Sequence, residues 1–160
     1  MWSRKFALQL IGMAAIAAAI PSTVLADPLI VSLPTLGVEA QTERLEVNNG
    51  ELGVPTNPDN IGTYQLRGNL VLVGHLDWAG KMRVFGRLRT LVGGEPIKLS
   101  DGRTYHVAWV SSVLASDTDL SEVFAAGDDV LTLITCDGAF SQSQHQYLER
   151  LTVRAVRDQT

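Results

Sequence analysis

The sequence predicts a mostly β domain, of barrel or sandwich type. Short runs of β-forming residues alternate with clusters of Gly, Pro, Asn and Asp through most of the chain, which is the pattern of short strands joined by turns. Two of the runs, NLVLVGHLD (69–77) and DVLTLITC (129–136), are almost continuously apolar, as in strands that are buried on both faces. No internal repeat, low-complexity tract or interdomain linker interrupts this pattern, so we expect one folded domain.

The first 26 residues are predicted to be a signal peptide or a retained N-terminal membrane anchor. Arg4 and Lys5 precede the apolar run FALQLIGMAAIAAAI, and Val24 and Ala26 form a small-residue cleavage site. The run is short for a helix that spans a membrane, which needs about 20 apolar residues. We therefore expect an exported protein, secreted or membrane-tethered, that acts at the cell surface or elsewhere outside the cytoplasm. Residues 27–160 would form its folded domain.

The first half of this domain contains three expected strands. Residues 29–47 offer two short strands that are interrupted at Pro34 and Gly37. Residues 48–64 form a turn-rich excursion, and the apolar strand at 69–77 follows it.

The second half begins with a single helical turn predicted over residues 84–91. A hairpin that pivots on Asp101–Gly102 follows. A short helix is expected over residues 118–129, where acidic residues stand in the first turn and a glycine near the end. The strand at 129–136 and a last strand at 150–156 complete the domain.

Charge and composition argue against several classes of function. The net charge of −4 becomes −6 once Arg4 and Lys5 are removed, and no stripe of basic residues is present, which argues against binding to nucleic acid or to an anionic membrane surface. Because Cys136 is the single cysteine, an intramolecular disulfide and a cysteine-based zinc site are excluded. The three histidines, His75, His106 and His145, lie far apart in the sequence. We therefore expect no metal and no cofactor.

Three predicted strand ends carry residues that together can perform acyl transfer. Cys136 ends one apolar strand before an Asp–Gly turn, His75 ends another after a glycine that would let a neighbouring backbone approach, and Arg150 opens the last strand. A thiolate attacks a carbonyl carbon, an imidazolium protonates the leaving amine, and a guanidinium stabilises the oxyanion. Because the pKa of a free thiol is about 8.5, the cysteine needs such neighbours at neutral pH.

The residues alone leave a second interpretation open. A cysteine in an apolar strand is commonly a core residue, and a single histidine after a strand commonly lies in the core or at the surface. An unpaired thiol in an exported protein is, however, exposed to oxidation, which favours a reactive role for Cys136.

These residues stand in motifs that resemble the sortase family, the cysteine transpeptidases of the cell surface. TLITC (132–136) matches the family's TLxTC pattern, GH within LVLVGHLD stands where sortases keep their histidine, and Arg150 opens the final strand in ERLTVRAV. SLPTLGVEA is similar to the family's first-strand segment. The segments NGELGVPTNPDNIGTY and VFGRLRTLVGGEPIKLSDGRTYHV are most like classes F and E. The resemblance covers residues 29–157.

The resemblance implies an all-β fold, an eight-stranded sortase-type β-barrel with one or two short helices, as the catalytic domain over residues 27–160. Cys136 would cleave the Thr–Gly bond of an LPxTG-like sorting signal through a thioacyl-enzyme. An amine acceptor, either a cell-wall precursor or a pilin lysine, would then resolve this intermediate. His75 would be the general acid and base, Arg150 the oxyanion and substrate-orienting group, and Thr135 part of the substrate pocket.

Other polar residues are weaker candidates. Asp77, two residues after His75, either orients the imidazole or is solvated. Arg154 shares a strand face with Arg150, but Arg150 at the strand entry fits the family pattern better. Two histidines are expected to be structural or exposed: His106 and His145.

Two further functions stay open from the sequence. A thiol peptidase would use the same residues and mainly hydrolyse the acyl intermediate. A non-catalytic exported barrel would bind peptide with Cys136 inert. An L,D-transpeptidase is disfavoured, because the histidine and glycine context of its cysteine is absent around Cys136.

Overall fold

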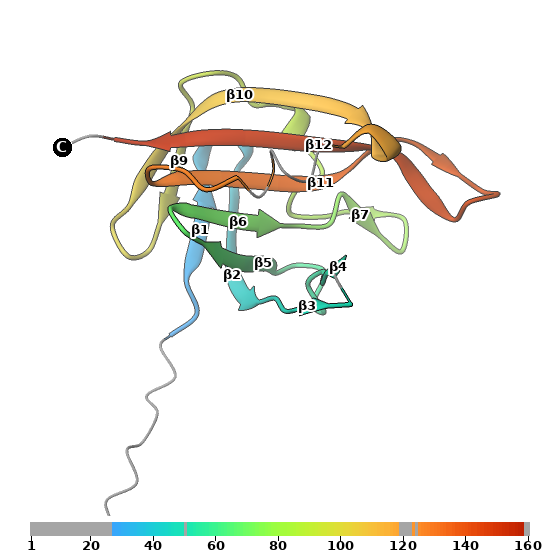
Figure 1. The fold of residues 1–160 in the computed structure, drawn as a ribbon, viewed down its shortest axis with the longest axis horizontal. Helices are drawn as coiled ribbons and strands as arrows, with labels where there is room; N and C mark the ends of the chain where they lie inside the picture. Colours follow the sequence, from blue (N-terminus) through green and yellow to red (C-terminus); the bar gives the residue numbers. More distant parts are fainter. Residues whose placement is uncertain (1–26, 50, 119–122, 124, 159–160) are drawn as a thin grey trace, which may run out of the picture.

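The computed structural model describes residues 27–49, 51–118, 123 and 125–158. Within these ranges eight strands close into a barrel (Figure 1), in the order β1-β2-β5-β6-β11-β12-β10-β9. This confirms the predicted eight-stranded barrel. Its strands are β1 (Ile30–Leu33), β2 (Val38–Arg44), β5 (Ile61–Leu66), β6 (Asn69–Val73), β9 (Pro96–Leu99), β10 (Thr104–Leu114), β11 (Val130–Ser141) and β12 (Gln146–Arg157).

Smaller elements join the strands of the barrel. In the described part of the chain there are two hairpins, β3 (Val47–Asn48) with β4 (Glu51–Leu52) and β7 (Asp77–Trp78) with β8 (Lys81–Met82). The same part contains three 3-10 turns, η1 (Pro34–Leu36), η2 (Leu88–Thr90) and η3 (Ala115–Asp117). The helical turn predicted over residues 84–91 is confirmed as η2.

Two other predictions fall mainly on residues that the structure does not describe. The short helix expected over residues 118–129 lies largely outside the described ranges, and the predicted signal peptide or anchor at 1–26 lies wholly outside them. Among the described residues, no helix combines the length and the apolar character that crossing a membrane requires.

The predicted turns around the first strands and the β9–β10 hairpin are present. Pro34 occupies the first position of η1, and Gly37 ends it with φ +65°, a left-handed conformation that glycine adopts without strain. Gly102, with φ +92°, lies in the turn between β9 and β10. These turns accompany the antiparallel pairing of β1 with β2 and of β9 with β10.

The inside of the barrel is a continuous apolar core. Leu131 and Leu133 of β11 and Val153 of β12 are fully buried, and side chains alternate between the two faces of a strand. The intervening residues of these strands therefore point outward. Complete burial of one such leucine stabilises the fold by roughly 2 kcal/mol relative to leaving it exposed.

The direction of two neighbouring strands places the candidate site. β6 and β11 pair in parallel, from Asn69 opposite Val130 to Val73 opposite Ile134. Parallel neighbours end at the same rim of a barrel, so the residues that follow each strand meet there. This rim lies toward the right-hand end of the barrel in Figure 1.

The predicted ends of the last two strands are wrong. β11 does not end at Cys136 but continues to Ser141, and β12 begins at Gln146, before Arg150. The two strands stay paired beyond the rim and form a long hairpin, whose turn lies at residues 142–145.

A bulge explains why the Asp–Gly pair does not end the strand. The register passes through Asp137 opposite Glu149 and is then shifted before Phe140 opposite Tyr147. Gly138, with φ +74°, lies inside this irregularity. A bulge of this kind bends a hairpin while its strands remain paired.

Candidate active site

Cys136 lies at the mouth of the barrel. The pairing of β11 with β6 stops at Ile134, whose carbonyl oxygen accepts a hydrogen bond from the amide of Gly74 at 3.3 Å. Beyond this point β11 is paired, among the described strands, with β12 alone. The thiol of Cys136 is free and half-buried. It points away from the barrel interior, because the neighbouring Thr135 is buried and side chains alternate along the strand.

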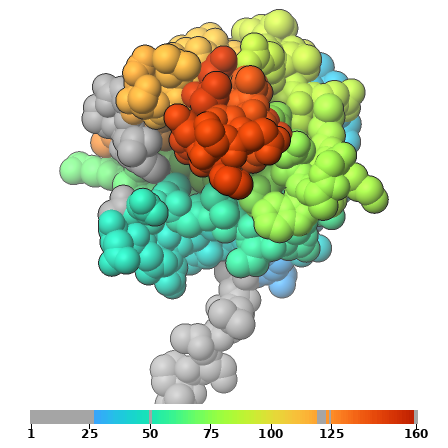
Figure 2. Space-filling view, turned by 90° about the vertical axis from the view of Figure 1, so that its right-hand side faces the viewer, coloured from blue at the N-terminus to red at the C-terminus, as the bar shows by residue number. Residues whose placement is uncertain are grey.

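The thiol opens onto a pocket of about 390 Å³, which His75 and Arg150 also line. The structure therefore brings together the three residues that the sequence singled out. Figure 2 faces this end of the molecule, with the tip of the β11–β12 hairpin in the centre (orange-red) between residues near 50 (teal) and residues near 85 (yellow-green). The rest of the lining is largely apolar: Glu51, Leu52, Gly53, Val54, Pro55, Val73, Gly74, Ile134 and Thr135.

His75 follows β6 and has a defined tautomer. Its Nε2 lies 3.0 Å from the carbonyl oxygen of Pro55. Because a carbonyl oxygen only accepts, Nε2 carries the proton in this contact, which leaves Nδ1 of the neutral ring as the proton acceptor. The ring also packs against Trp78, with ring centroids 5.1 Å apart and the planes 60° to each other.

The glycine before His75 makes room for a side chain. A Cβ atom on Gly74 would lie 2.5 Å from Cδ2 of Phe85. The sequence predicted a neighbouring backbone at this position, and the neighbour is instead this fully buried ring. The segment that carries His75 is thereby packed onto the core.

Arg150 lies directly opposite Cys136 in the β11–β12 register. Its Nη1 donates hydrogen bonds to the carbonyl oxygens of Tyr147 and Glu149, both at 2.9 Å. Among the described residues, Nη2 and Nε of Arg150 make no hydrogen bond. The guanidinium is thus fixed along its own strand and keeps donors for an oxygen of a bound substrate.

Burial raises the pKa of the Cys136 thiol above its ordinary value. The positive charge of Arg150 acts in the opposite direction, and the negative charge of Asp77 adds to the increase. The neutral thiol is therefore the favoured resting form, and attack requires that a base remove its proton.

Thr135 lines the pocket, but its hydroxyl is already engaged. Its Oγ1 donates to the carbonyl oxygen of Gly74 at 2.7 Å, and the side chain is 3% exposed. The bond joins the residue before Cys136 to the residue before His75. A direct contact of Thr135 with substrate stays a prediction.

Asp77 is oriented by a tyrosine of the opposite hairpin. The hydroxyl of Tyr147 donates to Oδ2 of Asp77 at 2.6 Å, and this bond raises the pKa of Tyr147 to about 12. Within the described ranges, the hydrogen bond of Asp77 goes to Tyr147 and not to His75. The contact connects β7 to β12 at the edge of the site.

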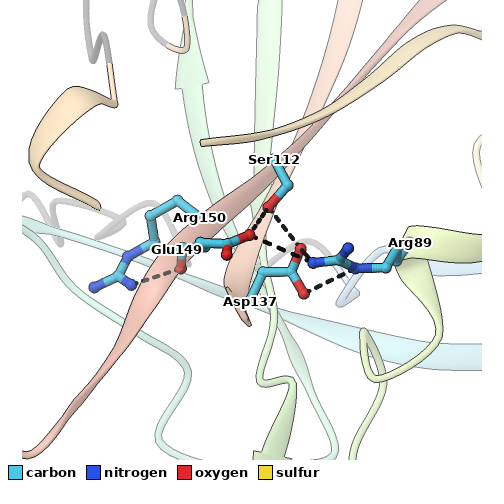
Figure 3. A network of polar contacts seen from close by, with 5 residues as sticks. All are labelled: Arg89, Ser112, Asp137, Glu149 and Arg150. Atoms are coloured by element: carbon cyan, nitrogen blue, oxygen red, sulfur yellow. Dashed lines mark hydrogen bonds and ion pairs between the residues drawn. The ribbon is translucent and has the colours of Figure 1, made fainter. Parts of the chain in front are cut away.

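Sequence reasoning missed a polar cluster that includes Asp137 and Glu149, the pair of the hairpin next to Cys136 and Arg150. Figure 3 shows this cluster beside Arg150. Its four members, here called the inner cluster, come from η2, β10, β11 and β12: Arg89, Ser112, Asp137 and Glu149. Nε and Nη2 of Arg89 donate to the two carboxylate oxygens of Asp137 at 3.1 and 2.5 Å.

Ser112 completes the inner cluster. Its Oγ lies 2.7 Å from Oδ2 of Asp137 and 2.8 Å from Oε2 of Glu149. Burial would raise the pKa of Asp137, but the hydrogen bonds from Ser112 and Arg89 outweigh burial, and this pKa lies below its ordinary value. The sequence does hold a signal: an acidic residue stands next to each of the two site candidates on the paired strands.

The remaining candidates lie away from the pocket. Arg154 is opposite Thr132 on β11, and its guanidinium lies 6.0 Å from the ring of Trp109. His106 contacts Asp158 at 2.5 Å. His145 is exposed in the hairpin turn, as expected. In the part of the chain that the structure describes, no group of three or more His, Cys, Asp or Glu side chains is arranged to hold a metal ion.

Comparison with known proteins identifies the family. Residues 20–158 match the family described as the sortase domain, and no curated protein matches the chain. Sortase A from Corynebacterium diphtheriae, as a lid mutant, is similar in structure, with a TM-score of 0.62 and 21% identity over 83% of this chain and 70% of that one.

Two further solved structures have the same fold. Pilus-related sortase C of Group B Streptococcus gives a TM-score of 0.63 and 19% identity over 85% of this chain and 69% of that one. Sortase A of Listeria monocytogenes gives a TM-score of 0.62 and 21% identity over 84% of this chain and 88% of that one. At these identities the structures show the fold, whereas the family match extends over most of the sequence. The chain therefore belongs to the sortase family of cysteine transpeptidases.

Proposed function

We propose that this sortase cleaves the Thr–Gly bond of an LPxTG-like sorting signal and transfers the acyl group to an amine on a cell-surface acceptor. The observation that carries the proposal is that Cys136, His75 and Arg150 line one pocket. We further propose that the chain falls in the class F or class E branch, on the sequence segments that resemble those classes. The solved structures to which it is similar include sortases A, C and D.

The first half-reaction forms a thioacyl-enzyme. Nδ1 of His75 removes the thiol proton, and the sulfur of Cys136 bonds to the threonine carbonyl carbon, whose oxygen takes the negative charge. The free N–H groups of Arg150 stabilise that oxyanion. When the carbonyl re-forms, the C–N bond breaks, and the imidazolium returns its proton to the departing amine.

The second half-reaction reverses these roles. The amine of the acceptor attacks the thioester carbon and gives a proton to His75, and the sulfur of Cys136 leaves as thiolate. Cell-wall precursors and pilin lysines both supply such an amine, and either is a suitable acceptor. Since burial disfavours the thiolate, few molecules are ionised at neutral pH, and we expect slow turnover.

The lining of the pocket supports an apolar recognition sequence. Leu52, Val54, Pro55 and Ile134 line the pocket onto which the thiol opens, and an LPxTG-like signal carries a leucine and a proline ahead of the scissile bond. Burying one such leucine contributes roughly 2 kcal/mol to binding energy before the costs of association. Sortases generally act outside the cytoplasm or anchored to the membrane, and we propose the same here, with residues 1–26 as signal peptide or tether.

A panel of quenched LPxTG-like peptides tests the proposal. The purified chain should cleave at least one peptide between threonine and glycine, and Cys136→Ala should cleave none. Adding an oligoglycine should convert the released acid into an aminolysis product, which mass spectrometry distinguishes by its mass. Cleavage without such a product would identify a thiol peptidase instead. If Cys136→Ala binds the peptides and the wild-type chain cleaves none, the protein is a binding barrel.

A further inference from the structure

The inner cluster lies against the two residues that the proposed mechanism needs most. Cys136 opposite Arg150 and Asp137 opposite Glu149 are consecutive pairs of the same hairpin. Adjacent residues of a strand point to opposite faces, so Cys136 and Arg150 line the pocket and the other pair faces the barrel interior. Figure 3 shows the side chains of Glu149 and Arg150 pointing to opposite sides of their strand. The side chain of Asp137 is 8% exposed, which makes its carboxylate a buried charge immediately behind the nucleophile.

We propose that Arg89 is a positioning residue of this sortase, which fixes both carboxylates of the inner cluster and neutralises their charge behind Cys136. The inference rests on the proposed role of Cys136 as the nucleophile. Arg89 itself does not line the pocket, so it acts through the hairpin and not by touching substrate.

Geometry singles out Arg89 within the cluster. The hydroxyl of Ser112 has one proton, so it donates to only one of the two carboxylates at a time. Nη2 of Arg89 lies 2.5 Å from Asp137 and 3.5 Å from Glu149, while its Nε holds the other oxygen of Asp137. Among the described residues, Arg89 is therefore the one cation that faces both acids.

The cluster also lies at the last regular pair before the bulge. A Cβ atom on Gly138 would lie 2.7 Å from the carboxyl carbon of Glu149, so the Glu149 side chain passes directly over the bulge. Holding Glu149 and Asp137 together therefore keeps the register that sets Arg150 opposite Cys136. Loss of this hold would loosen the hairpin where the site is built.

Charge gives the proposal a distinctive signature. With Arg89 present, one positive charge faces two carboxylates, and without it two uncompensated negative charges stand behind a thiol that burial already keeps neutral. The other titratable or charged groups around Cys136 remain unchanged in the variants below: Glu51, His75, Asp77, Tyr147 and Arg150.

The test is the pH dependence of alkylation by iodoacetamide, which reacts with the thiolate. Cys136 is the single cysteine, so the incorporated label reports on this thiol alone and needs no substrate. Arg89→Ala should lower the alkylation rate at pH 7 by about fivefold and move the profile to higher pH, because like charge disfavours the thiolate. Asp137→Asn should raise the rate by a similar factor, and the double variant should return close to wild type.

Matched variants separate charge from a general loss of structure. Arg89→Lys keeps the charge and should restore the profile. Arg87→Ala removes the same charge two positions earlier, where the side chain contacts the carbonyl oxygen of Leu36, and should leave the profile unchanged. Because 58% of the Arg89 side chain is exposed, Arg89→Ala is expected to remain folded, which circular dichroism checks.

Two outcomes would overturn the proposal. The first is an Arg89→Ala profile that superimposes on wild type, and the second is an equal shift in Arg87→Ala or Arg89→Lys. These readouts do not depend on the peptide assay, so a chain that cleaves no sorting signal refutes the proposed function without deciding the role of Arg89. In a chain that does cleave, Arg89→Ala should lower kcat and leave KM within about twofold, since it makes no contact with substrate.

Discussion

Cys136 and Arg150 face each other as a direct cross-strand pair of β11 and β12. The Cβ atoms of such a pair lie about 5 Å apart on the same face of the sheet, so the cation acts on the thiol through the register of the hairpin. A slip of β12 by one residue would send the Arg150 side chain to the opposite face. The site therefore depends on pairing along the whole hairpin and not only on the residues that line the pocket.

Arg150→Lys should lower kcat by about 100-fold, because a lysine ammonium has all its donors on one nitrogen. It lacks the planar fork in which Nη1 binds the backbone carbonyls while the other nitrogens donate to an oxyanion. The free-thiol content should stay at one per chain. Steady-state cleavage of the best peptide in the panel gives kcat, and thiol titration gives the content.

Arg154→Lys is the matched control for Arg150. It lies on the same strand face, opposite Thr132, and at about 3.3 Å per residue it is roughly 13 Å along the strand. Its kcat should remain within about twofold of wild type. Equal losses in the two variants would mean that the face as a whole, and not Arg150, supports the reaction.

Asp77→Asn should make Cys136 more reactive. Asp77 raises the pKa of the thiol, so removing its charge lowers that pKa and increases the thiolate fraction at neutral pH. The alkylation rate at pH 7 should rise by about threefold. Asp101→Asn, in the β9–β10 turn, removes the same charge far from the site and should leave the alkylation rate unchanged. A decrease in Asp77→Asn would show that the Tyr147–Asp77 bond supports the site more strongly than the charge opposes it.

The sequence was sufficient to predict the barrel and the residues at its mouth. Continuous apolar runs predicted β6 and β11. Of the motif residues, His75 follows β6 and Cys136 lies within β11. Because the two strands are parallel neighbours, their ends meet. Periodicity alone identifies strands without saying which of them are neighbours, so the expectation that His75 and Cys136 share a site rested on the family resemblance.

The bulge and the inner cluster could not be predicted in this way. Asp137–Gly138 is a good turn sequence, and only the continued pairing on β12 shows that the strand resumes at Phe140. Arg89 and Asp137 are 48 positions apart in the sequence, and their contact depends on where η2 packs. Local sequence patterns therefore identified individual candidate residues, whereas the contacts between them depend on long-range packing.

Stability should decline at alkaline pH in a way that depends on Cys136. Its pKa is raised in the folded protein, mainly by burial, so its contribution is complete below the ordinary thiol pKa of about 8.5 and is lost as the pH rises through the folded value. The pKa of Tyr147 is raised to about 12 by its bond to Asp77, so the ionisation of Tyr147 also lowers stability, at higher pH.

Thermal unfolding between pH 7 and pH 10 measures this loss. The fall in Tm should be smaller in Cys136→Ser, because the serine hydroxyl does not titrate in this range and only the shared groups remain. Parallel curves for the wild type and Cys136→Ser would contradict the raised pKa of the thiol.

Thr135→Val should uncouple the two halves of the site. The variant removes the 2.7 Å hydrogen bond to the carbonyl oxygen of Gly74 in a buried position, which should cost about 1–2 kcal/mol of unfolding free energy. Since Gly74 precedes His75, kcat should also fall, by about tenfold if the imidazole is displaced by a fraction of an ångström. Thr132→Val is the matched control. Thr132 lies on β11 like Thr135, and the variant removes a buried 2.9 Å hydrogen bond to Asn69 of β6 that lies away from the pocket. Urea unfolding should show similar destabilisation for both variants, and peptide cleavage should separate them; equal kcat in the two would mean that the Thr135 bond contributes to stability alone.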